Sequence, residues 1–595
     1  EQSSSTFAAQ ETLPPLPVPQ LDMTIKSLIW SAGGLATDDN ERKEFTAIAL
    51  GFLKGEGPKL QEMLQQHAEG KKNWLQEWWR HLAYLSFREP LVPQESTILL
   101  PDPRGRPLDR EERAASHTRA QLHILHSLET GKFPAITVRG KAICMHQWAK
   151  IYGTCRVPGD PVDESRRTDD SRHIVVFTPE CRAYRLQVLD QERLPLCEQD
   201  ILEALRHIAS ESKAAGTAPS VAALTTADRG TWAQARALLV ADPVSAASVE
   251  AIETALFVVS LAPSPPPADK PDYWKEASCP SSHGYRWHDT AIQYCFYPGG
   301  GGSCSMEHSE LDGAPPVQKN EMIADWIVAG SEGPCQSPVA RPADNVTPLP
   351  FNPSPAVLEM IPRVIADTET RRADYEVNLV AVDGVGKEDI KVLSVSPDAF
   401  VQLSLQLAHR RATGRSVATY ESVGTVGFYH GRTETMRSAT PDAVAMAIAD
   451  EKQVAKEELG ALVRKAAAMH SKAIGGCAMG MGIDRHLLGL QMMAKTQADG
   501  TPPALFQHPL FQRSQTWLLS SSQLTAPKST DFLGFRAVEY DGLGVCYQIQ
   551  DHVLKFTVTS FKGSAHSDGP KFATEIERAV RFMHGLLTDC PAPAQ

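Results

Sequence analysis

The sequence predicts an α/β fold, because segments with helical periodicity and short β-rich segments mix in both halves of the 595 residues. A chain of this length exceeds what one hydrophobic core supports, so we expect two or more domains. Their interface is then a place where a functional site could lie. No internal repeat of fixed period is present.

The first half is predicted to begin with an arm and a helical region. Residues 1–22 are expected to be extended, because the run Leu-Pro-Pro-Leu-Pro-Val-Pro cannot form a regular helix. From Met23 to Leu85 apolar residues recur at helical spacing. Asn73–Trp79 brings three tryptophans together, which a helix buried in a core also explains. His173–Thr178 and Tyr184–Leu189 predict a hairpin. Helices are expected at Asp200–Ser212, Thr231–Ala241 and Val249–Leu261.

A stretch of proline and small residues, Pro334–Pro355, predicts the domain boundary near residue 350. The N-terminal domain is then 23–350 and the C-terminal domain 351–595. Ser396-Pro397-Asp398 begins a long helix with a capping serine and a proline in the first turn. The other expected elements are strands at Tyr375–Val382, Thr516–Gln523 and Val545–Thr559, and helices at Glu451–Lys472, Ile483–Lys495 and Gly569–Leu587.

Composition narrows the function classes. With 59 Lys and Arg against 71 Asp and Glu, the net charge of −12 opposes non-specific binding to nucleic acid or anionic lipid, so an anionic substrate needs a local basic patch. The 11 cysteines are never spaced as a CxxC pair, which favours a reducing compartment and predicts no metal site. No apolar run approaches the ~18 to 20 residues that span a bilayer. A targeting peptide could have been removed before Glu1, and the C-terminus is not an SKL-type signal.

A histidine with a nearby carboxylate follows a run of glycines. His308 lies four residues before the Asp312-Gly313 turn. Imidazole titrates near pH ~6.5 and can be oriented through its second nitrogen, which suits general base catalysis. A solvated loop histidine is the alternative that spacing leaves open. Gly299–Gly302 satisfies no phosphate-binding pattern and predicts a turn.

A second polar cluster combines Thr419–Ser422 with Gly431–Thr440. Tyrosine and threonine hydroxyls close to arginine side chains can fix a carboxylate. A solvated polar loop has the same composition, so both interpretations stay open on these residues alone.

The chain resembles the choline/carnitine acyltransferases in three motifs that occur in the family order. These are Glu307-His308-x-x-x-Asp312-Gly313, Tyr420-Glu421-Ser422 to Gly431-Arg432-Thr433-Glu434-Thr435, and Ile483-Asp484-Arg485-His486-Leu487-Leu488. The resemblance extends over nearly the whole chain, through Leu16–Pro19, Asn73–Trp79, Cys155–Gly159, Ser396–Phe400 and Asp541–Val545. It implies two α/β domains of similar build, each a mixed sheet with covering helices as in chloramphenicol acetyltransferase. Coenzyme A (CoA) and carnitine would enter an interfacial tunnel from opposite sides.

The resemblance also implies the reaction, a reversible transfer of an acyl group between CoA and carnitine. His308 matches the family's general base, with Asp312 beside it, and the acceptor attacks the thioester directly without an acyl-enzyme. Ser520 and Ser522 match the outer positions of a Ser-Thr-Ser motif, where one hydroxyl, assigned to Ser522, donates to the oxyanion and the other binds the acceptor. Ser521 departs from the motif's threonine.

For carnitine, Tyr420 and Thr433 match the residues that hold its carboxylate and Arg485 matches the counter-charge. Trp79 and Tyr84 are implied as walls of this site. The family's choline enzymes lack both the arginine and the threonine, and an arginine facing choline would be unpaired and would repel the cation.

For CoA, Lys387 and Lys391 stand 11 and seven residues before Asp398, which is the family's spacing for its phosphate-binding lysines and a nearby acid. Glu421 and Ser422 match positions that line the CoA tunnel. No permanently bound cofactor and no metal are implied.

Two segments depart from the family pattern. Cys279–Trp287 replaces the usual glycine loop, and Phe535-Arg536-Ala537 places a charge where the family has a small residue. Lowered activity or an altered acyl preference would follow. Acyl length in the family depends on one position, where Leu533 lies beside Gly534; leucine predicts acetyl or short acyl groups, and a shift of one residue reverses this.

These departures motivate an alternative function, a catalytically weakened subunit of the same fold with a structural or interaction role. A third possibility, choline acetyltransferase, is opposed by Thr433 and Arg485. Family habit implies the mitochondrial matrix, with the peroxisome as the alternative. The partners expected are the small-molecule substrates, and membership of a larger assembly stays open.

Overall fold

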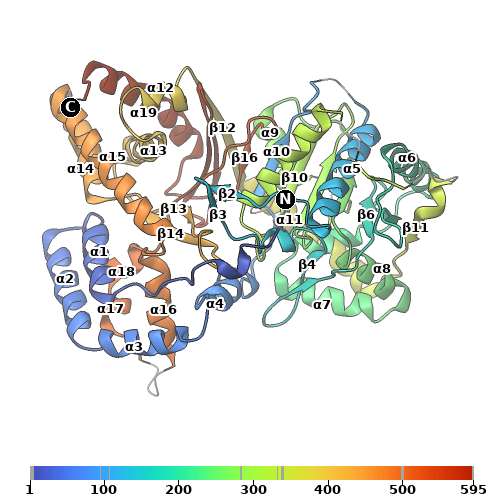
Figure 1. Ribbon diagram of the computed structural model, residues 1–595, viewed down its shortest axis with the longest axis horizontal. Coiled ribbons are helices and arrows are strands. Elements are labelled where there is room, and N and C mark those ends of the chain that lie inside the picture. The colour runs from blue at the N-terminus through green and yellow to red at the C-terminus, as the bar shows by residue number, and fades with distance from the viewer. Residues whose placement is uncertain are drawn as a thin grey trace.

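The computed structural model describes residues 6–93, 96–105, 108–281, 284–330, 333–336, 341–496 and 501–592. It contains two mixed β-sheets, each with covering helices, which confirms the α/β class (Figure 1). Within the described residues, no helix combines the length and the apolar character that crossing a bilayer requires.

The first sheet has eight strands, in the spatial order β11 (Val346–Leu349), β7 (Ala183–Gln187), β6 (His173–Phe177), β8 (Val258–Leu261), β9 (Ile292–Phe296), β10 (Gly302–Met306), β1 (Ser96–Leu100) and β16 (Leu533–Gly534). β8 is parallel to both of its neighbours and the other pairs are antiparallel. The predicted hairpin is confirmed as β6 and β7. Short ribbons flank the sheet: β2 (Thr137–Val138) with β3 (Lys141–Ala142), and β4 (Thr154–Val157) with β5 (Glu164–Arg167).

Helices cover both faces of this sheet. One face packs on α5 (Arg110–Glu129), α6 (Glu198–Ala215) and α10 (Ala314–Val328). The other packs on η4 (Val221–Thr226), α7 (Arg229–Val240), α8 (Pro243–Glu253) and α11 (Pro355–Asp374). α9 (Lys270–Ser278) lies against β1 and the second sheet. The short helical turns are η1 (Gln10–Thr12), η2 (His81–Leu85), η3 (Trp148–Lys150) and η5 (Pro342–Asn345).

The second sheet has six strands, in the order β12 (Tyr375–Asp383), β18 (Val553–Phe561), β17 (Leu543–Ile549), β15 (Leu519–Gln523), β13 (Thr419–Gly424) and β14 (Thr433–Arg437). Its three central strands β17, β15 and β13 run parallel. One face packs on α13 (Pro397–Thr413), α14 (Pro441–Glu451), α15 (Lys456–Ala478) and α19 (Gly569–Asp589), with α12 (Lys387–Lys391) nearby. Ser396 caps α13 as expected, its hydroxyl accepting from the Ala399 N–H at 3.4 Å.

A separate helical layer combines the first helices of the chain with helices from the second half. α1 (Leu21–Gly33), α2 (Asp39–Lys54), α3 (Gly57–Ala68) and α4 (Gln76–Arg80) share a core with α16 (Asp484–Lys495), α17 (Ala504–Gln507) and α18 (Pro509–Arg513). In Figure 1 these blue and orange helices lie together below the second sheet. Conversely, β16 from the second half pairs with β1 of the first sheet. The expected boundary near residue 350 falls between β11 and α11, and segments cross it in both directions.

From Thr6 onward, the arm before α1 is held by hydrogen bonds to several parts of the molecule. Thr6 Oγ1 donates to the Phe133 carbonyl at 2.7 Å, and the Pro14 carbonyl accepts from the Tyr429 N–H at 2.9 Å. The Pro17 carbonyl accepts from Trp74 Nε1 at 3.1 Å. The arm therefore contacts the first sheet's layer, the helical layer and the loop before β14.

The helix expected over Val249–Leu261 is wrong in its second half. α8 ends at Glu253, and Val258–Leu261 forms the buried parallel strand β8. A short apolar run fits a buried helix and a buried strand equally well by periodicity. The β-branched pair Val258 and Val259 was the available signal for the strand.

Candidate active site

His308 lies in the loop that joins β10 to α10, residues 307–313, called here the His308 loop. The Tyr84 ring stacks on the imidazole, with 5.1 Å between centroids and 11° between planes. His308 Nδ1 lies 3.8 Å from Asp312 Oδ1, longer than a hydrogen bond. Within the described residues neither of these buried atoms has a hydrogen-bond partner. Catalytic contacts of this kind are often long before substrate binds.

Asp312 is held by two side chains from distant parts of the chain. Its Oδ2 accepts hydrogen bonds from Gln147 Nε2 at 2.7 Å and from Arg432 Nε at 2.9 Å. Gln147 Oε1 accepts from the Asp312 N–H at 2.6 Å. Burial would raise the pKa of the Asp312 carboxyl, but the charge of Arg432, helped by these hydrogen bonds, outweighs burial and holds the pKa below its usual value. Asp312 is therefore a carboxylate at neutral pH.

Arg432 also fixes the backbone around the imidazole. Its Nη1 donates to the Ser309 carbonyl at 2.7 Å and its Nη2 to the His308 carbonyl at 2.9 Å. The guanidinium carbon lies 5.1 Å from the Tyr84 ring centroid. One arginine, located just before β14 of the second sheet, thus orients the loop that carries His308.

A buried charge network supports the first residue of the loop. Arg156 on β4 contacts Glu307 Oε1 at 3.2 Å through Nη1 and Asp163 Oδ2 at 2.7 Å through Nε. Its Nη2 donates to the Tyr84 carbonyl at 2.8 Å. Arg156 therefore ties the backbone that carries Tyr84 to the loop that carries His308, a structural reason for the Cys155–Gly159 motif.

A second polar cluster forms around Arg485 in the first turn of α16. Arg485 Nη2 donates to the Tyr420 hydroxyl at 3.2 Å and to Thr433 Oγ1 at 3.4 Å. Nε donates to the Thr433 carbonyl at 3.0 Å, and Nη1 to Thr435 Oγ1 at 3.1 Å. Burial would lower the pKa of Arg485, but nearby Tyr420 and acidic groups including Glu434 raise it. The structure brings Tyr420, Thr433 and Arg485 together, as expected for a carboxylate-binding cluster.

Aromatic rings connect this cluster to His308. The Arg485 guanidinium carbon lies 3.6 Å from the Trp79 ring centroid. Trp79 meets Tyr84 edge to face, with 6.2 Å between centroids, and Tyr84 stacks on His308. Trp79 and Tyr84 belong to the consecutive short helices α4 and η2. Trp79 and Tyr84, the two expected wall residues, therefore connect the Arg485 cluster to His308.

The serine motif lies on β15, and its side chains divide between two faces. Ser521 Oγ donates to the Tyr420 carbonyl at 2.9 Å and accepts from Gln402 Nε2 of α13 at 2.9 Å. Because strand side chains alternate, Ser520 and Ser522 share the opposite face, away from α13. Tyr420 pairs with Ser520 on the neighbouring strand. Ser521, in the middle, has a structural partner instead.

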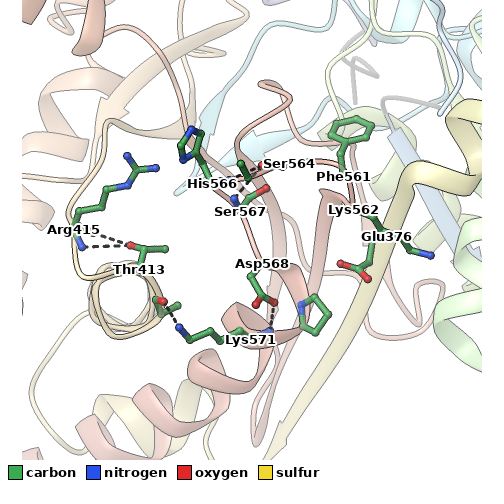
Figure 2. A pocket seen from close by; sticks show the side chains of 13 residues that line it. Glu376, Thr413, Arg415, Phe561, Lys562, Ser564, His566, Ser567, Asp568 and Lys571 are labelled. Atoms are coloured by element: carbon green, nitrogen blue, oxygen red, sulfur yellow. Dashed lines mark hydrogen bonds between the residues drawn. The ribbon is translucent and has the colours of Figure 1, made fainter.

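A cavity of about 600 Å³ lies away from all these residues, between the end of α13 and the start of α19 (Figure 2). Its basic groups include Arg415 and Lys571, but the Lys571 ammonium donates to the Ala412 carbonyl at 2.6 Å. Asp568 caps α19 by accepting from the Lys571 N–H at 2.9 Å. These groups are engaged in ending one helix and beginning another, and no expected site residue lines the cavity.

The residues expected to bind CoA fall into two groups. Lys387 and Lys391 of α12 are exposed, and their ammonium groups pair with Asp551 and Glu388 at 3.3 and 2.9 Å. Such exposed pairs contribute little and can exchange for a phosphate. Ser422 is half-buried on the same face of β13 as Tyr420.

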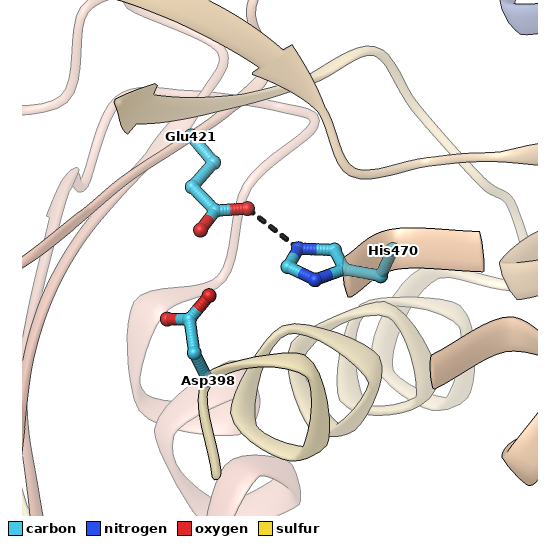
Figure 3. Close-up of side chains that lie close together, drawn as sticks. All are labelled: Asp398, Glu421 and His470. Carbon is cyan, nitrogen blue, oxygen red and sulfur yellow. Dashed lines mark hydrogen bonds and ion pairs between the residues drawn. The ribbon is translucent and has the colours of Figure 1, made fainter. Parts of the chain in front are cut away.

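Asp398 and Glu421 instead join His470 of α15 in a compact cluster (Figure 3). Glu421 Oε2 lies 2.7 Å from His470 Nε2 and accepts from Ser438 Oγ at 3.0 Å. Asp398 Oδ1 accepts from the Tyr547 hydroxyl at 2.7 Å. Burial raises the pKa of Glu421 to about 7, although His470 opposes this. Glu421 thus faces the helices, opposite to Tyr420 and Ser422.

The two residues expected to set acyl length occupy β16, where the sheets meet. Leu533 is buried in the core of the first sheet. At Gly534 an added Cβ would lie 2.6 Å from Thr557 Cγ2 and 2.9 Å from Trp274 Cζ2. The space beside Gly534 is therefore already filled by Trp274 and Thr557.

Residues 16–578 match a family model described as choline/carnitine O-acyltransferase. The chain belongs to this family. It is 29% identical to human carnitine O-acetyltransferase, covering 99% of this chain and 96% of that one. It is 30% identical to mouse peroxisomal carnitine O-octanoyltransferase, covering 98% and 97%. Acetyl and octanoyl enzymes are therefore similar to this family member to the same degree.

Solved structures similar to the chain include the epimerization domain of the third module of tyrocidine synthetase B, at 9% identity and a TM-score of 0.35, covering 84% of this chain and 93% of that domain. The first condensation domain of the calcium-dependent antibiotic synthetase matches at 10% identity and a TM-score of 0.35, covering 87% and 95%.

The departures from the family pattern are only partly visible. Ser282 and His283 of the altered glycine loop lie outside the described residues. Arg536 is half-buried, and its guanidinium carbon lies 5.2 Å from the Phe87 ring centroid. The family's small residue is thus replaced by a cation that rests on an aromatic ring three residues beyond Tyr84.

Sequence reasoning missed the two residues that hold Asp312. Arg432 belongs to the Gly431–Thr435 motif, but the sequence analysis gave it no role. Its position beside Thr433 could have indicated that it lies in the site. Gln147 carried no signal, because nothing in Met145-His146-Gln147 indicates a contact with a carboxylate 165 residues away.

Proposed function

We propose that this protein transfers an acyl group reversibly between CoA and the hydroxyl of carnitine, with His308 as the general base. The observation that carries the proposal is the Arg485 cluster at one end of an aromatic wall and His308 at the other. Carnitine has its hydroxyl on the carbon β to its carboxylate, so Arg485, Tyr420 and Thr433 would hold the carboxylate while the hydroxyl is presented to the imidazole.

In the proposed step, His308 removes the proton of the carnitine hydroxyl as that oxygen attacks the thioester carbonyl. The new C–O bond forms, the C–S bond breaks, and the proton passes from His308 to the departing CoA thiolate. Asp312 stabilises the imidazolium that exists in between. Ser522 is the proposed donor to the oxyanion and Ser520 a contact of the acceptor, since both side chains share the face opposite α13.

CoA is proposed to bind through its phosphates at Lys387 and Lys391, with Ser422 along its path. Asp398 and Glu421 are proposed to have a structural role instead of contacting CoA. Their cluster with His470 lies behind β13, so we propose that it supports the strand that carries Tyr420 and Ser422.

Acetyl or short acyl groups are the proposed donors. Leu533 is packed into a core, and the space that glycine could have opened at position 534 is filled by Trp274. Extra methylenes in a filled site force side chains out of place.

The mitochondrial matrix is the proposed location, although one of the relatives above is named as peroxisomal. Fractionation of the cells that make this protein tests that proposal separately from the chemistry.

The test of the reaction is thiol release from acetyl-CoA and octanoyl-CoA, with carnitine or choline as the acceptor. We expect carnitine-dependent release that His308→Ala abolishes. Circular dichroism must show that both proteins are folded. No release from folded wild type with any pair would favour the alternative, a weakened subunit with a structural role, for which the cation at Arg536 is the motivating observation.

A further inference from the structure

A lysine lies in the core of the first sheet's layer without a counter-charge. Lys319 of α10 is 0% exposed. Its Nζ has no hydrogen-bond partner and no carboxylate within ion-pair distance among the described residues. Its neighbours are the ring faces of Tyr152 and Tyr294, whose centroids lie 4.7 and 5.4 Å away. An unpaired buried ammonium is costly, so this position calls for an explanation.

Two more donors in the same place are also unsatisfied. Gln121 Nε2 of α5 and Asn320 Nδ2 of α10 are buried without partners in the described part of the chain. Their amide oxygens are engaged, accepting from the Tyr152 hydroxyl at 2.8 Å and from the Tyr294 hydroxyl at 3.0 Å. The nearest groups that could accept are the Tyr294 hydroxyl for Gln121 and the Cys304 thiol for Asn320, and no described carboxylate pairs with these donors.

The lowered pKa of Lys319 is consistent with a site that binds an anion. Burial lowers the pKa of Lys319 to about 7, with only the Cys304 thiol opposing this. The other titratable groups that contact Lys319 or act on it are Tyr152, Tyr294 and His117, with Arg113 beyond His117. Within the described residues none of these is a carboxylate. A carboxylate brought to Lys319 would restore its charge.

The cluster lies beside β10, the strand that leads into the His308 loop. Cys304 of β10 pairs with Tyr294 across the sheet and precedes His308 by four residues, a separation of at most about 14 Å. Met306 follows Cys304 on the same face of β10, and Ile98 of β1 pairs with both Cys304 and Leu533, so these side chains belong to one core on this face of the sheet. That core is filled, so an acyl group that reaches Lys319 must displace side chains such as unbranched Met306.

We propose that the acyl site accepts an acyl group that ends in a carboxylate, an ω-carboxyacyl group, with Lys319 as the partner of that carboxylate. This inference rests on the transferase function proposed above and names a further substrate class for it. The ω-carboxyacyl group leaves the CoA sulfur and forms an ester with the carnitine oxygen, while its far carboxylate is unchanged. Gln121 and Asn320 donate to the same carboxylate.

The proposed preference for short acyl groups is compatible with the proposed acceptance of ω-carboxyacyl groups. Leu533 disfavours an apolar chain of medium length because nothing offsets its displacement. For an ω-carboxyacyl chain of the same length, the ion pair with Lys319 offsets that cost. Wild-type protein then selects acetyl and ω-carboxyacyl groups over the plain medium chain.

The test compares carnitine-dependent thiol release from acetyl-, octanoyl- and suberoyl-CoA, the last being an eight-carbon chain with a terminal carboxylate. We expect suberoyl-CoA to exceed octanoyl-CoA at least tenfold in kcat/KM, and Lys319→Met to lower that ratio at least tenfold. Lys528→Met is the control. It removes an exposed ammonium that pairs with Asp325 of the same helix, at 2.7 Å, and should leave the ratio unchanged.

The outcomes separate this inference from the transferase itself. No release from acetyl-CoA contradicts the proposed function. Release from acetyl-CoA without a suberoyl preference, or with one that Lys319→Met leaves intact, overturns the inference and makes Lys319 a lysine satisfied by buried water. If Lys319→Met does not fold, Lys319→Gln serves the same comparison. The preference should also fade as the pH rises above about 7, where unliganded Lys319 loses its proton.

Discussion

Arg432 and Asp312 form an ion pair of 2.9 Å between residues 120 positions apart, and the same guanidinium donates to the carbonyls of His308 and Ser309. A residue of the second half of the chain thereby sets the geometry of the loop that carries the proposed base.

Replacing Arg432 with glutamine should lower kcat at least tenfold, because Asp312 and the His308 loop lose their orientation together. The buried carboxylate would also lose its counter-charge, at a cost of about 3 to 5 kcal/mol in the free energy of unfolding. Steady-state kinetics and denaturant unfolding measure the two effects. Arg80→Gln is the control, since the half-buried Arg80 contacts Glu310 of the same loop at 3.2 Å and makes no hydrogen bond to Asp312; equal losses in both variants would contradict the assignment.

The stability difference between wild type and Asp312→Asn should depend on pH in one direction. Since the folded state lowers the pKa of this carboxyl, its ionisation stabilises the fold above the unfolded pKa of about 3.9. That contribution is lost as the pH falls through the folded pKa. Denaturant unfolding at pH 6 should therefore separate the two proteins, and unfolding at the most acidic pH that keeps them folded should bring them together. If the difference in unfolding free energy does not change with pH, Arg432 does not lower the pKa of Asp312.

Arg485→Gln should raise the KM for carnitine about 100-fold, with a smaller change in the KM for acetyl-CoA, because a charged hydrogen-bonded partner of the carboxylate is worth about 2 to 5 kcal/mol. Choline is the informative second acceptor. Its use should improve relative to carnitine in the variant, since an unpaired cation has been removed. If the ratio of choline use to carnitine use does not change, the carnitine carboxylate does not bind at Arg485.

The contribution of the Glu421–His470 pair to the free energy of unfolding should fall as the pH rises from 5 to 8. Burial raises the pKa of Glu421 to about 7 and, despite burial, the charge of Glu421 raises that of His470. At this pair the folded state thus binds more protons than the unfolded state through this range, so the pair's contribution falls with pH. The unfolding free energy of wild type minus that of the double variant Glu421→Gln, His470→Gln should therefore decrease from pH 5 to pH 8. A difference that stays constant or increases would contradict this protonation.

Two substitutions distinguish what limits acyl length. If Leu533 closes the site, Leu533→Gly should raise the octanoyl-to-acetyl ratio of kcat/KM at least tenfold while Trp274→Ala does not. If the space beside Gly534 is the relevant one, Trp274→Ala has that effect instead. Thermal unfolding of both variants must accompany the kinetics, since each opens a cavity worth about 2 to 5 kcal/mol. No change in either ratio would remove β16 from the acyl site.

The sequence predicts much of the local structure of this protein. The cap at Ser396 and the hairpin at β6 and β7 are determined by residues within a few positions of each other, so periodicity and turn signals find them. The strand β8 shows the limit, because Val258–Leu261 is buried on both faces and loses the alternation that identifies a strand.

The site itself was predicted in its separate parts. The motifs around His308, Tyr420 and Arg485 were recognisable, and the structure brings the last two together through hydrogen bonds of Arg485. The aromatic wall from Arg485 to His308 was not predictable as a geometry, because Trp79 and Tyr84 reach it only when α4 and η2 pack between the sheets.

Sequence alone therefore determined most of the helices and strands, and it contained the residues able to hold a carboxylate or move a proton. Tertiary structure alone decided that Gln147 and Arg432 converge on Asp312, that Glu421 faces the helices, and that Lys319 is buried without a hydrogen-bond or ion-pair partner among the described residues. The physical reason is that local signals depend on neighbours along the chain, whereas burial and charge pairing depend on residues that folding brings together from distant positions.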